Sequence, residues 1–279
     1  MRVLPAPIPA PLATHGRLGF AEAAFRQGHR VLAEETAVAL SYDGATYAVM
    51  MATPADLEDF ALGFSLTEGI IATQASIEEL EVVARGPLGI EIRMYLSETA
   101  KARLVRRSRA MAGPAGCGLC GLQALEDVAR TLPHVSAALS LSPSDVTAAM
   151  SALRDAQALN REARAIHAAG FWRPHDGLLA IAEDVGRHNA LDKVAGKLTR
   201  LGTQGATGLI ALTSRVSVEL VQKAARIGAP VIAAISAPTA LAVRTAEACG
   251  ITLIAVARDG AFEVFTHPAR IDEAARGTH

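Results

Sequence analysis

The amino-acid sequence predicts an α/β protein with two parts, a small N-terminal α+β domain and a larger layered α/β domain. From about residue 142 onward, short apolar runs alternate with segments of helical period, which indicates a largely parallel sheet covered by helices. Before that point, strand-like runs flank an Asp-Gly turn and a helical segment follows. We therefore expect a flexible tail at residues 1–27, one domain at residues 28–141 and a second at residues 142–279.

The predicted tail is rich in proline and lacks the apolar core of a signal peptide. Its prolines are Pro5, Pro7, Pro9 and Pro11. No apolar run in the sequence reaches the roughly 18 residues that a membrane-spanning helix requires. We therefore expect a cytoplasmic protein that does not associate with a membrane.

The N-terminal domain is expected to begin with two strands, at residues 31–42 and 45–51, joined at Asp43-Gly44. A helix is predicted to follow, with Thr53 as its N-cap and Pro54 at its first position. Its buried face is expected to contain Leu57, Phe60, Ala61 and Phe64, and Gly69 lies near its end. Two further strands are predicted at residues 77–84 and 89–96.

The second domain is expected to begin with an amphipathic helix that runs from Ser142-Pro143 to about Leu159. After it, strands are predicted at residues 178–182, 208–213, 231–235 and 252–257, and helices at residues 189–201, 218–227 and 240–249. We expect a homodimer. The last two helices are apolar, and periodicity does not decide whether they pack on the core or across the dimer interface.

Composition excludes some classes of function. The 279 residues carry a net charge of −1, and only 4% of them are aromatic. A nucleic-acid-binding surface usually needs excess positive charge, and single-stranded nucleic acid also needs aromatic side chains on which bases stack. We therefore expect no nucleic-acid partner.

Two of the three cysteines, Cys117 and Cys120, share one short glycine-rich loop. A nearby positive charge or a helix N-terminus lowers the pKa of a thiol and favours the reactive thiolate. Both features are expected here, because a helical segment follows the loop and four arginines precede it. These arginines are Arg103, Arg106, Arg107 and Arg109. The cysteine pair is therefore predicted to be a nucleophilic or sulfur-handling site.

Three other interpretations of the cysteine pair remain open. A zinc site would need distant ligands such as Cys249, His167 or His188, and we expect no metal. A structural disulfide is uncommon in the cytosol. A thioredoxin-like redox centre would follow a strand, and no clear strand precedes Cys117.

Polar residues follow three of the strands predicted in the second domain. Arg187 and His188 follow the first, Ser214 the second and Ser236 the third. Ligands of α/β sheets bind at the carboxyl ends of the strands, so these residues are candidates for an anion-binding pocket. Helix capping would also explain the serines. An ion-pair network would explain the cluster of charges formed by Glu183, Asp184, Arg187, His188 and Asp192.

Two motifs resemble those of the FdhD family, whose members are sulfur-carrier accessory proteins of molybdenum-dependent formate dehydrogenase. One is the loop at residues 116–121 (GCGLCG), and the other is the run at residues 183–193 (EDVGRHNALDK). Further agreement occurs at residues 50–59, 213–215 and 235–239. The resemblance extends from about residue 34 to residue 271, and the long run is far more specific than the cysteine pair.

The resemblance implies a function. Members take sulfur from a cysteine desulfurase as a persulfide and pass it to the molybdenum bis(guanine dinucleotide) cofactor of the dehydrogenase. Cys117 would then carry the persulfide with Cys120 as its partner, and the molybdenum cofactor would be cargo rather than a permanent cofactor. The alternatives are a non-catalytic chaperone that binds the cofactor or the apo-enzyme, and a dithiol oxidoreductase.

The resemblance also implies a fold and a cofactor site. The second domain would resemble cytidine deaminase, but the zinc-binding motif of the deaminases is absent from the sequence, so deamination is not expected. The cofactor would bind near a late strand end, with the three earlier strand ends as neighbours. The predicted cofactor-binding residues are Val256, Ala257, Arg258, Asp259, Gly260, Ala261, His167, Arg187, His188, Ser214 and Ser236.

One departure from the family pattern affects this site. A Thr-Gly-Gly-x-His stretch is usual before the long motif, and this chain has Ala163-Arg164-Ala165-Ile166-His167 instead. Loss of both glycines removes close backbone approach to a ligand, so an altered cofactor pocket or a different client enzyme is expected.

Overall fold

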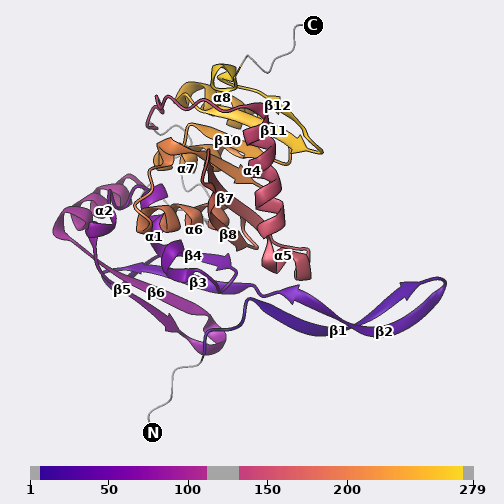
Figure 1. Ribbon diagram of the computed structural model, residues 1–279. Helices are drawn as coiled ribbons and strands as arrows, with labels where there is room; N and C mark the ends of the chain where they lie inside the picture. Colours follow the sequence, from indigo (N-terminus) through magenta and orange to yellow (C-terminus); the bar gives the residue numbers. More distant parts are fainter. Residues whose placement is uncertain (1–6, 112–131, 273–279) are drawn as a thin grey trace, which may run out of the picture.

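The computed structural model describes residues 7–111 and 132–272 (Figure 1). It contains a two-stranded hairpin (β1-β2), a four-stranded sheet (β4-β3-β6-β5) and a six-stranded sheet (β12-β11-β10-β9-β7-β8). The strands are β1 Leu12–Ala21, β2 Ala24–Ala33, β3 Thr36–Tyr42, β4 Ala45–Ala52, β5 Ile77–Ala84, β6 Ile90–Leu96, β7 His167–Arg173, β8 Gly177–Asp184, β9 Leu209–Leu212, β10 Val231–Ala234, β11 Thr252–Arg258 and β12 Ala261–Val264. The α-helices are α1 Leu57–Thr67, α2 Glu98–Met111, α4 Pro143–Ala156, α5 Ala158–Ala163, α6 Arg187–Arg200, α7 Val218–Ile227 and α8 Ala240–Cys249.

The predicted α/β class is confirmed, and the four-stranded and six-stranded sheets fall within the two predicted domains. No helix in the described residues is both long enough and apolar enough to cross a membrane. The resemblance of the second part to a deaminase stays a prediction, as do the domain boundaries.

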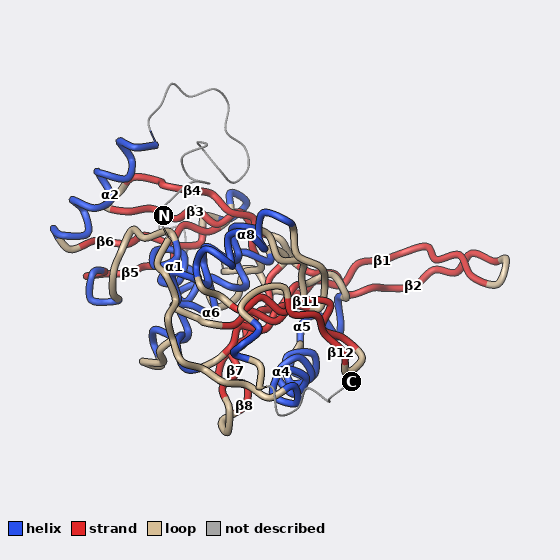
Figure 2. The backbone as a smooth tube through the Cα atoms, turned by 90° about the horizontal axis from the view of Figure 1, so that it is seen from above, coloured by secondary structure: helices blue, strands red, loops and turns tan. Residues whose placement is uncertain are grey.

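The flexible tail predicted for residues 1–27 is wrong from Leu12 onward. Residues 12–33 form the antiparallel hairpin β1-β2, which extends away from both sheets (Figures 1 and 2). The sequence does not predict this hairpin because its two strands are largely exposed and contain glycines and arginines, so they show no clear apolar alternation. Its turn at Glu22 and Ala23 also lacks glycine, although both residues have positive φ angles.

The four-stranded sheet forms around the predicted turn. Asp43 and Gly44 adopt φ angles of 47° and 84°, as a two-residue hairpin turn requires. Helix α1 covers one face of this sheet with the four side chains expected to be buried. The predicted cap is wrong, because α1 begins at Leu57 and Asp56 is its N-cap. The Thr53 hydroxyl instead accepts a hydrogen bond of 3.1 Å from the backbone N–H of Val185, in the second part of the chain.

The six-stranded sheet is mixed rather than largely parallel. Only the β9–β10 and β10–β11 pairs are parallel; β7 lies antiparallel between β8 and β9, and β12 lies antiparallel to β11. Strand β7 was not predicted because its central residues are all buried and show no alternation. Strands β8, β9, β10 and β11 nevertheless point the same way, so their carboxyl ends share one edge.

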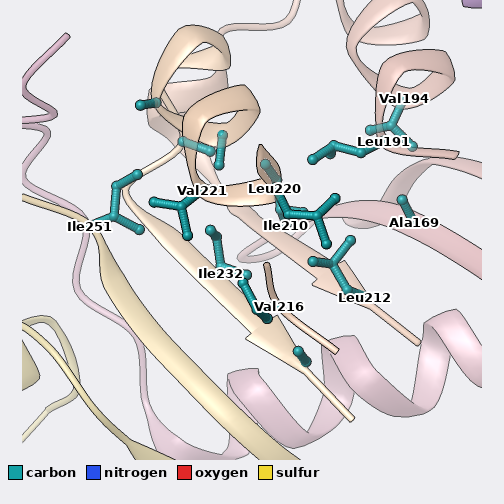
Figure 3. Close-up of a cluster of buried hydrophobic side chains, with 14 of the residues drawn as sticks. Ala169, Leu191, Val194, Ile210, Leu212, Val216, Leu220, Val221, Ile232 and Ile251 are labelled. Carbon is teal, nitrogen blue, oxygen red and sulfur yellow. The ribbon is translucent and has the colours of Figure 1, made fainter. Parts of the chain in front are cut away.

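Helices cover both faces of this sheet. On one face, α6, α7 and α8 contribute to an apolar cluster that includes Leu191, Leu220, Val221 and Ile232 (Figure 3). On the other face, α4 packs through Val146, Ala149 and Leu153. The second part is therefore a three-layer α/β/α sandwich.

The two parts meet where helices α1 and α6 cross. A Cβ atom added at Gly63 would overlap the carbonyl oxygen of Asp192, and one added at Gly196 would overlap that of Asp59. The two backbones therefore touch at this crossing, which only glycine allows. Helices α1 and α6 thus pack backbone to backbone where the two parts meet.

Buried charges join the two parts beside this crossing. The Lys193 ammonium donates to the Asp184 carboxylate (2.6 Å) and to the Thr53 carbonyl oxygen (2.9 Å). The Asp192 carboxylate accepts from Lys223 (2.9 Å) and from the Thr67 hydroxyl (2.6 Å). Both networks connect α1, or the loop before it, to the second part. Because each charge is buried and hydrogen-bonded, loss of a partner is costly.

We expect Gly196→Ala to lower the free energy of unfolding by about 2 kcal/mol or more, because its methyl group forces α1 and α6 apart. This loss exceeds the roughly 1 kcal/mol that alanine gains over glycine in a helix. Denaturant unfolding measures the change. Gly16→Ala is the matched control, since no atom lies within 4 Å of its added Cβ. Equal stability of the two variants would contradict contact at the crossing.

We expect Lys193→Met to lower the free energy of unfolding by about 3 kcal/mol, since it leaves a buried carboxylate without its counter-ion. Lys101→Met, which removes the solvent-exposed pairs with Glu98 and Asp43, should cost much less than Lys193→Met. Thermal and urea unfolding of both variants would test the difference. A loss at Lys193 no larger than that at Lys101 would show that the buried pair does not stabilise the fold.

Candidate functional site

Most of the residues predicted to bind the cofactor lie along one edge of the six-stranded sheet. This edge contains the carboxyl ends of β8, β9, β10 and β11 and the beginning of β7, where His167 pairs with Asp184. In strand order, the edge runs from the β11–β12 turn past Ser236 and Ser214 to His167. It ends at Arg187 and His188, which follow β8. The structure therefore aligns the predicted residues without bringing them into one pocket.

A cleft of about 380 Å³ lies at one end of this edge, between α4 and the β11–β12 turn. Five of the six predicted residues in the late strand end line it, and Val256 does not. The lining residues at this end are Ala257, Arg258, Asp259, Gly260 and Ala261. Its size suits a small-molecule ligand or one arm of a larger one.

Helix α4 supplies the opposite wall of the cleft. Ser144, Thr147, Ser151 and Arg154 all line it. Sequence reasoning missed these residues, although the polar face of this amphipathic helix was the signal that could have identified them. Together with Arg258, they give the cleft two guanidinium groups and three hydroxyl groups, which suits phosphate oxygens.

The backbone at this end of β11 is strained. Val256 has a φ angle of 52°, which is unusual for a β-branched residue, and the strand register shifts between Ala255 and Arg258. The backbone N–H of Val256 donates to the Ser236 carbonyl oxygen (3.4 Å). Strained backbone often accompanies a functional site, and here the kink lies immediately before the residues that line the cleft.

A second group of predicted residues lies at the other end of the edge. Burial lowers the pKa of His167, and the nearby positive charge of Arg187 lowers it further. His167 is therefore a neutral imidazole near neutral pH. The buried Nε atom of Arg187 has no hydrogen-bond partner among the described residues. The Arg187 side chain as a whole is half-buried at this end of the edge.

His188 lies beside the start of α7. Its Nε2 atom is 3.2 Å from the Ser217 hydroxyl and 3.7 Å from the Glu219 carboxylate. The neighbouring His188 imidazole lowers the pKa of Glu219 to about 2, so this carboxylate stays charged. The imidazole of His188 is therefore already engaged with α7.

Most of the other polar side chains in the run at residues 183–193 serve the fold. Glu183 accepts hydrogen bonds from the first-turn amides of α5, at Leu159 and Asn160 (both 2.8 Å). Asp184, Asp192 and Lys193 belong to the buried networks between the two parts. The sequence left open whether these charges form ion pairs or a binding site. The structure shows that Asp184, Asp192 and Lys193 form ion pairs.

The two serines differ from each other. Ser214 is buried, and its hydroxyl donates to the Arg215 carbonyl oxygen (2.9 Å), so it stabilises its own turn. Ser236 is half-buried at the end of β10, next to Val256. Of the two, only Ser236 adjoins the residues of the cleft.

The predicted sulfur-handling residues, Cys117 and Cys120, lie outside the described residues. Cys249, the third cysteine, is buried in the apolar cluster of the second part, and burial raises its thiol pKa. It is therefore a poor nucleophile and a poor metal ligand. In the described ranges, no three His, Cys, Asp or Glu residues are grouped closely enough to hold a metal ion.

Comparison with known proteins identifies the family. The sequence matches the FdhD/NarQ family over residues 33–272. It is 54% identical to the sulfur carrier protein FdhD of Agrobacterium fabrum over 88% of this chain and 90% of that protein. It is 52% identical to the protein of the same name from Brucella abortus, over 89% of this chain and 93% of that protein.

A solved structure has the same fold. It is the crystal structure of a protein described as a formate dehydrogenase accessory protein, from Desulfotalea psychrophila. The two structures superpose with a TM-score of 0.74, covering 94% of this chain and 99% of that one, at 24% sequence identity. The sequence relationship extends over nearly the whole length of the curated relatives, and the fold agrees. This chain therefore belongs to the FdhD/NarQ family.

Proposed function

We propose that this protein is a sulfur carrier for a molybdenum-dependent formate dehydrogenase. It takes sulfur from a cysteine desulfurase and passes it to the molybdenum bis(guanine dinucleotide) cofactor of that enzyme. The observation that carries the proposal is the name of the relatives, sulfur carrier protein, at 54% and 52% identity, together with the Cys117–Cys120 pair in this sequence. Because the cysteines must stay reduced to accept sulfur, we place the protein in the cytoplasm.

The first step loads the sulfur. The thiolate of Cys117 attacks the outer sulfur of the desulfurase persulfide, and a new S–S bond forms on this protein. The bond between the two sulfurs of the desulfurase breaks, and its cysteine leaves as a thiolate. Arg103, on α2, belongs to the basic segment before the cysteines and adds positive charge that favours a thiolate.

The second step delivers the sulfur. The thiolate of Cys120 attacks the inner sulfur, which belongs to Cys117, and the outer sulfur leaves as hydrosulfide that the molybdenum centre accepts. Cys117 and Cys120 are then oxidised to a disulfide. A thiol reductant, such as a dithiol protein, must return the pair to its reduced form before the next cycle.

The cleft between α4 and the β11–β12 turn is the proposed binding site for one end of the cofactor. Arg154 and Arg258 bring two guanidinium groups to it, and these groups bind phosphate oxygens through charge-assisted hydrogen bonds. Arg187, with a buried Nε atom that lacks a partner among the described residues, would contact the same cargo at the other end of the edge. None of the residues in the altered stretch before His167 lines the α4 cleft.

We expect a peptide containing Cys117 and Cys120 to gain one sulfur atom, about 32 Da, when the protein is incubated with a cysteine desulfurase and L-cysteine. Reduction should remove the added mass. Peptide mass spectrometry measures both changes, with Cys249→Ala as the control that should still be loaded. Cys117→Ala should prevent loading. An unmodified peptide in the presence of an active desulfurase would favour the non-catalytic chaperone instead.

We expect Arg258→Ala to weaken the binding of guanosine diphosphate, used as a probe for one end of the cofactor, by roughly tenfold or more, because a charge-assisted hydrogen bond is lost. Isothermal titration calorimetry measures the affinity. Arg173→Ala is the control, since Arg173 forms an ion pair with Asp176 at the opposite edge of the sheet. Equal affinity in both variants would place the nucleotide elsewhere.

A further inference from the structure

Three arginines lie at the carboxyl edge of the six-stranded sheet, away from the α4 cleft. They belong to three adjacent strands, since the order of the sheet there is β9-β7-β8. Arg215 follows β9, Arg164 precedes β7 and Arg187 follows β8. None of the three lines the α4 cleft. We call these three residues the edge arginines.

Backbone pairing brings the three segments together. The backbone N–H of Ala168 donates to the Thr213 hydroxyl (2.8 Å), and the backbone N–H of Thr213 donates to the Ala168 carbonyl oxygen (3.1 Å). On the other side of β7, His167 pairs with Asp184. Each edge arginine is two or three residues along the chain from Thr213, His167 or Asp184. Their side chains therefore start close enough together to contact one ligand.

The edge arginines have no counter-ion within the described part of the chain. Neither an ion pair nor a side-chain hydrogen bond joins Arg164, Arg187 or Arg215 to a residue in those ranges. Arg187 is half-buried, and its Nε atom is buried without a partner there. Because a partly buried charge is stabilised by an opposite charge, these guanidinium groups are suited to an anionic ligand.

The carboxylates at this end of the edge are engaged elsewhere. Glu183 accepts hydrogen bonds from the first-turn amides of α5, and Asp184 pairs with a buried lysine (2.6 Å). The Glu219 carboxylate lies 3.7 Å from the Nε2 atom of His188. Glu162, on α5, is exposed and makes no ion pair with an edge arginine. The positive charge of the edge arginines is therefore not neutralised by these groups.

The N-terminus of α6 adds to this positive potential. Its N-cap is Gly186, so no side chain caps the first turn, and that turn contains no acidic residue. The helix has 14 residues, and its dipole places positive potential at the end where Arg187 lies. Helix N-termini bind anions through their unpaired amide groups. The helix and the edge arginines thus favour the same kind of ligand.

Arg164 has a backbone conformation that favours glycine. It is the C-cap of α5, with a φ angle of 54°. Strained residues are concentrated at ligand-binding sites, where binding compensates for the strain. Arg164 is exposed, so packing in the core does not explain an arginine at this position.

His167 begins β7, the middle one of the three strands. Burial lowers the pKa of His167, and the positive charge of Arg187 lowers it further. The neutral imidazole can donate a hydrogen bond to a ligand without adding to the repulsion among the arginines.

We propose that the edge arginines form a second anion-binding site, which binds a compact multivalent anion of the cargo while the α4 cleft binds a nucleotide end. This assignment rests on the proposed function, which supplies the molybdenum cofactor as cargo. Two parts of that cargo have the required chemistry, namely the phosphates of its second dinucleotide arm and its oxygen-bearing molybdenum end. Arginine binds such groups through charge-assisted hydrogen bonds, often in pairs.

The two sites are spaced for one large ligand. Three strand steps separate β7 from β11 in the order β11-β10-β9-β7. Each step is about 4.8 Å, so the sites are about 14 Å apart along the edge. A cofactor with two dinucleotide arms has anionic groups at its centre and in both arms, and it can therefore occupy both sites at once. Its affinity would exceed that of a single nucleotide because the second contact is intramolecular.

We expect Arg164→Gly to weaken the binding of inorganic pyrophosphate at least about tenfold, because a charge-assisted hydrogen bond is lost. Isothermal titration calorimetry measures the affinity in the Arg258→Ala background, so that the α4 cleft contributes little. Arg164→Lys keeps the charge and should lose less affinity than Arg164→Gly. Glycine suits the positive φ angle, so Arg164→Gly should be at least as stable as the unchanged protein in thermal unfolding.

Arg173→Ala in the same background is the control, since it removes one positive charge at the opposite edge of the sheet. Molybdate is the second probe. Tighter binding of pyrophosphate would assign the site to a dinucleotide arm, and tighter binding of molybdate would assign it to the molybdenum end. No binding of either anion, or equal affinity in the Arg164→Gly and Arg173→Ala variants, would overturn the site.

Sulfur loading separates this proposal from the proposed function. Cys117 should gain sulfur from the desulfurase as readily in Arg164→Gly as in the unchanged protein, because loading does not require the cargo. Peptide mass spectrometry measures the loading. A protein that binds pyrophosphate at the edge arginines but gains no sulfur would retain the anion site and lose the sulfur-carrier function. Normal loading without anion binding would overturn the anion site alone.

Discussion

The Asp184 carboxylate holds the two parts of this protein together. It has no exposed surface, and it accepts four hydrogen bonds: from Lys193, the backbone of Thr53, the backbone of Gly186 and the side chain of Asn189. A buried charge is tolerated only when it is fully paired, so the loop before α1, the end of β8 and the start of α6 must keep their relative positions. The helix crossing at Gly63 and Gly196 depends on the same positions. Arg187 and His188, at one end of the candidate site, follow Asp184 closely, so the network fixes the backbone at that end.

Within residues 183–193, some side chains stabilise the fold and others lie at the candidate site. Glu183, Asp184, Asp192 and Lys193 are buried and hydrogen-bonded, whereas Arg187 is only half-buried. The run at residues 183–193, the most specific motif of the sequence, therefore serves mainly to hold the two parts in their relative positions. Its remaining polar residues lie at the edge where the strands end. The cleft beside α4 lies at the far end of that edge, so a ligand bound in both places would lie along the sheet rather than within a single cavity.

The sequence predicted those elements whose local signals agree with the tertiary structure. Helices α7 and α8 match their predicted bounds because each has an apolar face and ends at a glycine with positive φ, Gly228 or Gly250. Strand β7 was missed because it is buried on both faces. The Thr53 cap was wrong because its hydroxyl bonds across the interface, which no local pattern reveals. Arg154 was missed as a site residue because only the tertiary fold places α4 against the β11–β12 turn.

The contact between α1 and α6 has a further consequence for the connectivity of the chain. The polypeptide passes from the first part to the second between Met111 and Leu132, but the buried ion pairs and the glycine crossing lie elsewhere. The peptide link is therefore not what keeps the two parts associated. A cut between these residues would leave the two parts joined by the helix crossing and the buried ion pairs. The association of the two parts therefore rests on noncovalent contacts rather than on the continuity of the backbone.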